Sequence, residues 1–192
     1  MSGGIGVLGG TFDPIHFGHL ITAQDLLEKR GLDKIIFIPC YISPHKTENV
    51  NSQASHRLNM TRLAISGYPG FECSSFEIDN GGVSFSIDTL RELKKTEKNI
   101  ELIIGYDNLA KFYTWKEPDE ILKLAKLVVM ERSTHISDIE EDRFYRAAEF
   151  VKTPNIEISA TKIRERVRNG LPIDFLVPQA VRQYIFDNKL YI

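Results

Sequence analysis

The chain has few of the residues that build disulfide frameworks, metal clusters or membrane spans. Among its 192 residues only Cys40 and Cys73 are cysteines, and they lie too far apart to form a CxxC pair. The sequence therefore predicts two reduced thiols rather than a disulfide scaffold or a structural zinc site. No apolar run approaches the length of a membrane span, and residues 1–4 carry no basic side chain. We therefore expect neither secretion nor membrane insertion, and a cytoplasmic protein.

A large excess of charge of either sign is also absent. The 24 lysines and arginines nearly balance the 26 aspartates and glutamates, which gives a net charge of -2. Without a basic field a long polyanion such as DNA is not the expected partner. A small phosphorylated ligand needs only a local positive pocket, and this balance permits one. The length of the chain fits one domain with a proper core.

Apolar runs of the kind that form strands alternate with helical patterns along the chain. The runs are continuous, as in strands that are buried on both faces. This alternation predicts the α/β class, with a doubly wound parallel sheet and helices on both faces. We expect one domain over residues 1–192, with the helical segment at about 160–192 packed on it. Strands are predicted at residues 5–8, 35–38, 71–76, 100–104, 127–130 and 156–158, and helices near 18–30, 54–66, 86–96, 107–124 and 139–150.

Candidate phosphate-binding segments follow the predicted strands. Ligands of open parallel sheets bind beyond the carboxyl ends of the strands. The segments 9–19, 44–46, 105–107 and 159–164 each come directly after an apolar run. Residues 40–53, which contain Pro44 and many polar side chains, are predicted to form a loop at the same edge.

The first of these segments combines glycines with two histidines at the start of a helix. Gly9 and Gly10 allow the backbone to approach a ligand closely. The spacing of His16 and His19 can place both rings on one side of the helix, facing the turn. Helix amides and two rings that can carry charge suit a phosphate, which suggests nucleotidyl transfer. In the alternatives, the two rings form a metal pair, although no nearby carboxylate or thiol completes it, or His16 only caps the turn.

The segment after residue 158 offers a second anion site. Ser159 or Thr161 can cap a helix, and Arg164 can point from its first turns toward the same place. The alternative is an ordinary helix cap with a solvated basic face. That reading suits Lys162 better than it suits Arg164.

Two further segments have both a functional and an ordinary interpretation. Pro44-His45-Lys46 can close over a triphosphate or be a plain surface loop. In the segment after residue 104, the functional interpretation is that Asp107 accepts from ribose hydroxyls and Trp115 stacks on a flat ring. In the ordinary interpretation, Asp107 caps a helix and Trp115 belongs to the core. Next to these, His56-Arg57 is interpreted mainly as the start of a packed helix.

The signature strings resemble those of a known enzyme family. His16-Phe17-Gly18-His19 resembles the (H/T)-x-G-H signature of the nucleotidyltransferase superfamily. The longer string Gly9-Gly10-Thr11-Phe12-Asp13-Pro14-Ile15-His16 is similar to the nicotinate mononucleotide adenylyltransferase family of NAD biosynthesis. The string Ile158-Ser159-Ala160-Thr161-Lys162-Ile163-Arg164 resembles the second signature, I-S-[SA]-T-x-I-R, with Ala160 where many members have serine.

Shorter matches follow in the order of the family. Pro44-His45-Lys46 is similar to the family's P-H-K loop, and Gly105-Tyr106-Asp107 with Trp115 is similar to a G-x-D segment followed by a tryptophan that covers the pyridine ring. Thr89-Leu90 is similar to a pair that recognises the nicotinate carboxylate, although Phe85 stands where many members have tyrosine.

This resemblance implies a Rossmann-like fold and an enzyme that joins ATP and nicotinate mononucleotide to nicotinate adenine dinucleotide, releasing pyrophosphate, with Mg²⁺ accompanying ATP. His16, His19 and Arg164 would be catalytic. The implied ATP-binding residues are Gly9, Gly10, Thr11, Phe12, His16, His19, Lys46, Gly105, Asp107, Ser159, Thr161 and Arg164. Those implied for the nicotinate nucleotide are Thr11, Phe12, Lys46, Thr89, Leu90 and Trp115.

Three rival functions remain open at the level of the sequence. One is a nucleotidyltransferase that acts on phosphopantetheine or a related phosphomonoester, and another is a nucleotide sensor without catalysis on the same fold. The third, a nucleic-acid binder, is disfavoured by the acidic balance of charge. The sequence does not decide the oligomeric state, and a homo-oligomer is compatible with it.

Overall fold

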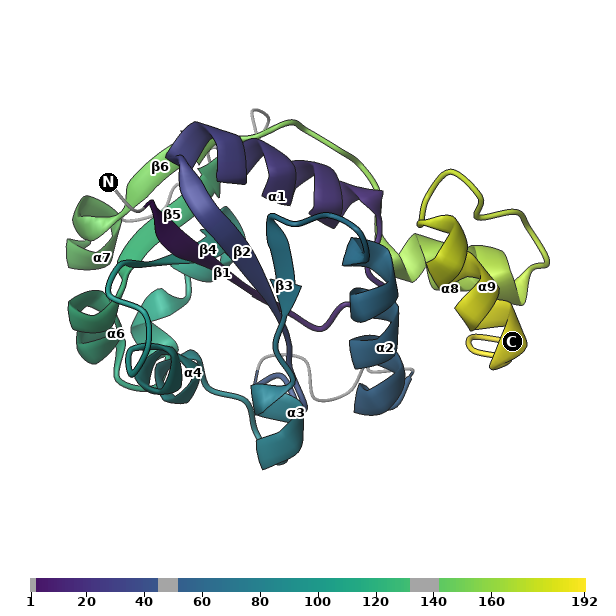
Figure 1. The fold of residues 1–192 in the computed structure, drawn as a ribbon, viewed down its shortest axis with the longest axis horizontal. Coiled ribbons are helices and arrows are strands. Elements are labelled where there is room, and N and C mark those ends of the chain that lie inside the picture. Colours follow the sequence, from purple (N-terminus) through teal and green to yellow (C-terminus); the bar gives the residue numbers. More distant parts are fainter. Residues whose placement is uncertain (1–2, 45–51, 132–141) are drawn as a thin grey trace.

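The structure, a computed structural model, describes residues 3–44, 52–131 and 142–192 of the chain (Figure 1). Its centre is a six-stranded sheet in the order β3-β2-β1-β4-β5-β6, in which every neighbouring pair is parallel. The predicted doubly wound parallel sheet is therefore confirmed. Its strands are β1 (Gly4–Gly10), β2 (Leu32–Pro39), β3 (Phe71–Cys73), β4 (Ile100–Gly105), β5 (Lys126–Glu131) and β6 (Glu149–Lys152).

Helices cover both faces of the sheet because successive side chains of each strand point to opposite sides. In β2, Ile35 and Phe37 belong to one hydrophobic cluster, while Ile36 and Ile38 belong to another. The first cluster packs against α1, α2, α8 and α9, and the second against α4, α5, α6 and α7. The helices are α1 (Phe17–Arg30), α2 (Ala54–Ile65), α3 (Phe76–Asn80), α4 (Ser86–Leu93), α5 (Tyr106–Leu109), the short 3₁₀ helix η1 (Phe112–Thr114), α6 (Pro118–Leu124), α7 (Arg143–Ala147), α8 (Ala160–Arg168) and α9 (Gln179–Asp187).

The strand order reverses its direction at β1. From β1 the chain moves outward through β2 to β3, and then crosses back to continue from β4 through β5 to β6. Connections that diverge from two adjacent strands leave a crevice beyond their carboxyl ends, where ligands of such sheets bind. The turn after β1 and the turn after β4 flank that crevice.

Of two predicted elements in the carboxyl half of the chain, the strand is wrong, and the helix over 139–150 is confirmed only at α7 (Arg143–Ala147). Residues 156–158 do not form a strand; Ile158 instead packs its side chain against the first hydrophobic cluster from a loop. The last strand is β6, in a segment predicted as the end of a helix over 139–150, of which residues 139–141 lie outside the described residues. The apolar pair Phe150-Val151 joins the sheet because β5 offers an open edge there. Pro154, which lacks a backbone donor, follows soon after.

Two other differences are smaller. The predicted helix over 107–124 is divided into α5, η1 and α6, and Pro118 begins the last of these as expected. The predicted strand over 71–76 ends at Cys73, and α3 begins at Phe76.

The segment after residue 159 packs against α2 and the turn after β1. The Tyr184 hydroxyl on α9 lies 3.0 Å from Nδ1 of His56 and accepts from Nδ2 of Asn59 at 3.0 Å. Figure 1 shows α8 and α9 on the side of the molecule where α2 lies. In the part of the chain that the structure describes, no helix has the length and apolar character needed to cross a membrane.

Candidate active site

The turn between β1 and α1 is shaped by glycines that make room for rings. A side chain on Gly10 would meet the Phe12 ring at 2.8 Å, and one on Gly18 would meet the His16 ring at 3.0 Å. Phe12 itself adopts a left-handed backbone (φ 50°) and is buried against Phe37 and the edge of the His19 ring. At Gly9, by contrast, an added side chain would meet nothing within 4 Å. The turn is therefore packed on one side and open at Gly9.

His16 and His19 lie face to face at the start of α1. Their ring centroids are 3.7 Å apart with an angle of 26° between the planes. The prediction that the two rings share one side of the helix is confirmed. The backbone N–H of His16 donates to Nδ1 of His19 at 3.3 Å, so Nδ1 is an acceptor and the ring proton of neutral His19 resides on Nε2. His16 is also the N-cap residue of α1, so its place as a cap and its place beside His19 are compatible.

Arg164 joins the second signature to the first. It is buried in α8, and its Nη1 donates to the carbonyl oxygen of Asp13 at 2.7 Å, while Nη2 donates to Oγ1 of Thr161 at 3.2 Å. The structure thus brings Arg164 to the histidine turn across 151 positions of sequence. Of the two predicted caps, Ser159 is the N-cap residue of α8, although its side chain makes no capping bond. Thr161 lies inside the first turn, where its hydroxyl accepts from Arg164.

Asp13 is the buried centre of this junction. Its Oδ1 accepts from the Tyr191 hydroxyl at 2.6 Å and from Oγ of Ser52. Burial, together with the Asp13 carboxylate beside it, raises the pKa of Tyr191, so that the phenol remains a donor. Ser52 belongs to the loop predicted over residues 40–53, so Asp13 connects the described end of that loop, the histidine turn and α8. The sequence analysis placed Asp13 only within the signature string of residues 9–16, since no motif spacing relates residue 13 to residue 191.

Arg57 is a second residue whose role the sequence analysis missed. It is 1% exposed, and its guanidinium donates to three backbone carbonyls, of Thr11 at 2.9 Å, Cys40 at 2.6 Å and Tyr41 at 2.8 Å. Arg57 does lie near the start of a packed helix, as predicted. It also ties together the turns that follow β1 and β2. In the sequence, the only signal for this role was an arginine next to a histidine at the start of a helix that was predicted to be packed.

The predicted phosphate loop is only partly described. His45 and Lys46 lie outside the described residues, so their predicted role stays a prediction. Pro44 stands exposed in a turn, and Ile42 forms a bridge with Val83 just before it.

The turn after β4 presents the residues that were predicted to meet ribose and pyridine. An added side chain on Gly105 would meet nothing within 4 Å, so this strand end is open. Asp107 is exposed in the first turn of α5, and the N-cap is Gly105, so the alternative that Asp107 caps the helix is wrong. Trp115 is half-buried and stacks on the buried Phe112 ring with centroids 5.0 Å apart. The tryptophan is thus attached to the core at its edge.

Thr89 and Leu90 are placed differently from the other candidates. Both are buried in α4, Leu90 completely. The Thr89 hydroxyl donates to Oε1 of Glu77 at 2.6 Å, and burial raises the pKa of this glutamate. The hydroxyl hydrogen is therefore engaged within the protein. A contact with a nicotinate carboxylate would require the bond to Glu77 to be exchanged.

Comparisons with known proteins agree with this geometry. The Cytidylyltransferase-like family model matches residues 7–166. A protein of Methylacidiphilum infernorum (isolate V4), named "Probable nicotinate-nucleotide adenylyltransferase", is 44% identical over 190 residues, which cover 98% of this chain and 92% of that protein. A Herpetosiphon aurantiacus protein of the same name is 39% identical over 195 residues, covering 98% of each.

Solved structures show the same fold at lower identity. The Plasmodium falciparum nicotinic acid mononucleotide adenylyltransferase complexed with NaAD superposes with a TM-score of 0.76 at 18% identity, covering 97% of this chain and 96% of that one. This likeness supports the Rossmann-like arrangement of the sheet. With the sequence relatives and the family model, it leads to one conclusion: the chain belongs to the nicotinate-nucleotide adenylyltransferase family and is a nucleotidyltransferase.

Proposed function

We propose that the protein joins ATP and nicotinate mononucleotide, giving nicotinate adenine dinucleotide and pyrophosphate, a step of NAD biosynthesis. The names of its full-length relatives support this reaction. The observation that carries it in the structure is the meeting of the stacked histidine pair with Arg164 beside the β1–β4 crevice. Basic side chains and a helix start that converge on one place suit phosphoryl groups.

The reaction needs positioning more than proton transfer. A phosphate oxygen of nicotinate mononucleotide forms a bond to the α-phosphorus of ATP, and the bond from that phosphorus to pyrophosphate breaks. The attacking oxygen is already an anion, so no protein base has to remove a proton from it. Catalysis therefore rests on alignment of the two substrates and on stabilising the charge that builds up on the transferred group.

The chain's own residues have distinct parts in this proposal. His19, with its ring proton on Nε2, would donate to an oxygen of the transferred group, and His16 would lie beside the same oxygens. Arg164, which joins α8 to the histidine turn through the Asp13 carbonyl, would place its positive charge near the phosphates that leave. Lys46 would hold the same phosphates from the loop after β2.

The remaining predicted contacts divide between the two nucleotides. We assign ATP to the open edges at Gly9 and Gly105 with Asp107, and the pyridine ring to Trp115. Thr11, Phe12 and Gly10 shape the turn between the two substrates. Thr89 and Leu90 support the pyridine site from within α4.

A divalent ion is expected to accompany ATP, and we propose Mg²⁺. In the described part of the chain, no group of three or more histidine, cysteine, aspartate or glutamate side chains could hold a metal. The side chains that meet at the crevice are mainly donors, which fit phosphate oxygens, so the ion would be held by the triphosphate and by water. Bound in that way, Mg²⁺ neutralises charge on the triphosphate.

We also propose that residues 1–192 act as one domain and that the reaction takes place in the cytoplasm, where ATP is available. A single hydrophobic cluster supports the first point, because it includes Leu8 of β1 together with Ile163 of α8 and Val181 of α9.

Pyrophosphate release tests this function directly. The purified protein would be incubated with ATP, Mg²⁺ and one of nicotinate mononucleotide, nicotinamide mononucleotide or phosphopantetheine. We expect turnover with a strong preference for the nicotinate nucleotide. Activity with phosphopantetheine alone would show that nicotinate mononucleotide is not the substrate. ATP binding without pyrophosphate release in any mixture would favour a nucleotide sensor.

A further inference from the structure

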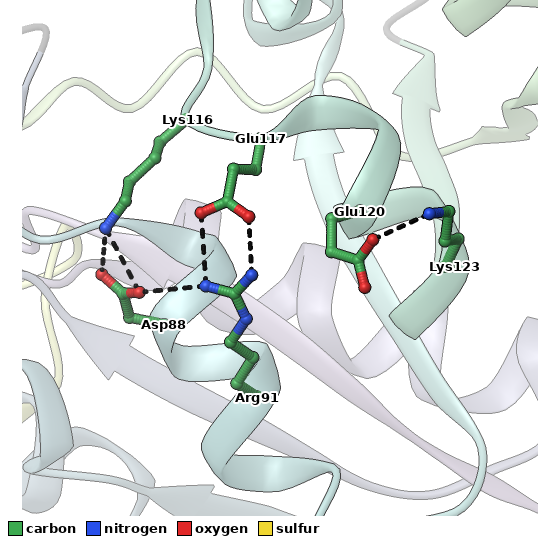
Figure 2. Close-up of polar contacts among 6 residues, drawn as sticks. All are labelled: Asp88, Arg91, Lys116, Glu117, Glu120 and Lys123. Atoms are coloured by element: carbon green, nitrogen blue, oxygen red, sulfur yellow. Dashed lines mark hydrogen bonds and ion pairs between the residues drawn. The ribbon is translucent and has the colours of Figure 1, made fainter.

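Four charged side chains connect α4 to the turn that carries Trp115. Asp88 and Arg91 project from α4, and Lys116 and Glu117 follow Trp115 directly (Figure 2). Lys116 Nζ lies 3.0 Å from Oδ2 of Asp88 and 3.3 Å from Oδ1. Arg91 forms a two-pronged pair with Glu117, at 2.6 Å and 3.2 Å. We call these four residues the charge clamp.

The two ion pairs of the clamp contact each other, and one of them also contacts an aromatic ring. Arg91 Nη1 also lies 3.8 Å from Oδ1 of Asp88, so the two pairs are joined. Lys116 Nζ stands 4.7 Å from the centroid of the Phe85 ring, at the residue that precedes α4. The hydrogen bond from Arg91 lowers the pKa of Glu117. The charges of the two acidic and two basic side chains cancel. The clamp can therefore hold the turn in place, but it adds no net charge to the site.

The backbone between Trp115 and α6 needs such support. Glu117 has φ 53° and ψ 56°, a left-handed conformation that is disfavoured for a residue with a side chain. Conformations of this kind persist where the surroundings hold them in place. The two-pronged bond to Arg91 acts on the very residue that adopts it. Without that bond, the backbone at Glu117 can relax to a more favourable conformation. Because Trp115 lies two residues away, this change would alter the position of its side chain.

The other end of the clamp is rigid. Ile87 and Leu90 anchor α4 in the second hydrophobic cluster and are completely buried. Trp115 has its own core contact, the Phe112 ring on one side. Phe112 and the turn that the clamp fixes to α4 both contribute to the orientation of the indole.

We propose that Asp88, Arg91, Lys116 and Glu117 are positioning residues, which hold the Trp115 turn against α4 and so set the affinity for the pyridine nucleotide without affecting that for ATP. The inference rests on the proposed function, in which Trp115 covers the pyridine ring. Each clamp side chain is between 41% and 47% exposed. Exposed pairs add little to global stability, so variants of the clamp should fold.

The chain offers a matched control. Glu120 and Lys123 form an ion pair of 2.9 Å within α6, beside the clamp and of the same exposed kind (Figure 2). This pair does not join two elements. Glu120→Gln therefore removes an ion pair without loosening the turn, whereas Arg91→Gln removes the bonds to Glu117 and Asp88.

Two measurements test the proposal. Trp115 is the only tryptophan of the chain, so acrylamide quenching of its fluorescence reports on this turn alone and needs no substrate. We expect Arg91→Gln to raise the quenching constant, and Glu120→Gln to leave it at the wild-type value. In steady-state assays Arg91→Gln should raise KM for nicotinate mononucleotide about 2- to 5-fold, the range that an exposed ion pair can supply. KM for ATP and kcat should stay unchanged, and Arg91→Lys should recover part of both effects.

Several outcomes would overturn the proposal. Equal quenching in Arg91→Gln and Glu120→Gln would show that the clamp does not position Trp115. Altered quenching with an unchanged KM for nicotinate mononucleotide, or a KM that rises equally for ATP, would separate the clamp from the pyridine site. Wild-type protein that does not use nicotinate mononucleotide would refute the proposed function instead, and the quenching result would still decide whether the clamp holds the turn.

Discussion

Replacing Arg57 by methionine removes three hydrogen bonds from the turns that carry the proposed site. The bond to the Cys40 carbonyl is buried, while those to the Thr11 and Tyr41 carbonyls are partly buried. A buried acceptor left without a donor costs about 1–3 kcal/mol, and each partly buried bond contributes about 0.5–1.5 kcal/mol. We therefore expect Arg57→Met to lower the free energy of unfolding by about 2–6 kcal/mol.

Urea unfolding, followed by circular dichroism, measures this loss. The midpoint should fall while the m-value stays constant, as expected for a change in stability alone. Arg62→Met is the matched control, because Arg62 lies on the same helix and is exposed. It should change the stability by no more than about 0.5 kcal/mol. If the two variants unfold at the same urea concentration, the three carbonyl contacts of Arg57 do not stabilise the protein and our reasoning is wrong.

Four further substitutions or reagents probe the site and its surroundings. His19→Ala should lower kcat for pyrophosphate release roughly 10²–10³-fold, and an unchanged kcat would remove His19 from the mechanism. Tyr191→Phe deletes the donor to Asp13 and should cost about 1.5–3 kcal/mol in urea unfolding, whereas equal midpoints would show that the bond contributes nothing. Burial raises the pKa of Glu77 above its unfolded value, so ionisation of this side chain lowers the stability of the protein as pH rises. Glu77→Gln should therefore be more stable than the wild type at pH 8 and lose that advantage toward about pH 4. A stability difference that does not depend on pH would contradict this. Burial raises the pKa of Cys73 to about 11, so the rate of its alkylation by iodoacetamide, followed by mass spectrometry, should increase up to that pH. A rate that levels off near pH 9.0, the ordinary pKa of a thiol, would refute the shift.

The sheet was predictable because its central strands are buried on both faces. Continuous apolar runs such as residues 35–38 and 102–104 are typical of strands with helices on both sides. The strand β6 was not predictable, because Glu149–Lys152 is only four residues long and its apolar pair also fits the end of a helix. An edge strand of this kind is defined by the open side of β5, which is a property of the assembled sheet.

The proposed site was predictable only where its signals are local. His16 and His19 are three residues apart at a helix start, and their stacking follows from that spacing. The bonds of Arg57 to the turns after β1 and β2 cross 46, 17 and 16 positions of sequence. The contact of Tyr191 with Asp13 crosses 178. No periodic pattern relates such partners, since they meet only after the sheet has brought their elements together.

The bond between Asp13 and Tyr191 cannot form until residue 191 has been synthesised. At about 5–20 residues per second, roughly 10–35 s separate translation of the histidine turn from translation of the phenol that completes its buried aspartate. During that interval a nascent chain can form β1 and α1, but it holds an incompletely bonded Asp13. A ribosome that stalls before residue 191 would therefore release a chain with both signature motifs and an unfinished junction between them. In this molecule the junction beside the proposed catalytic centre is completed only after residue 191 has been translated.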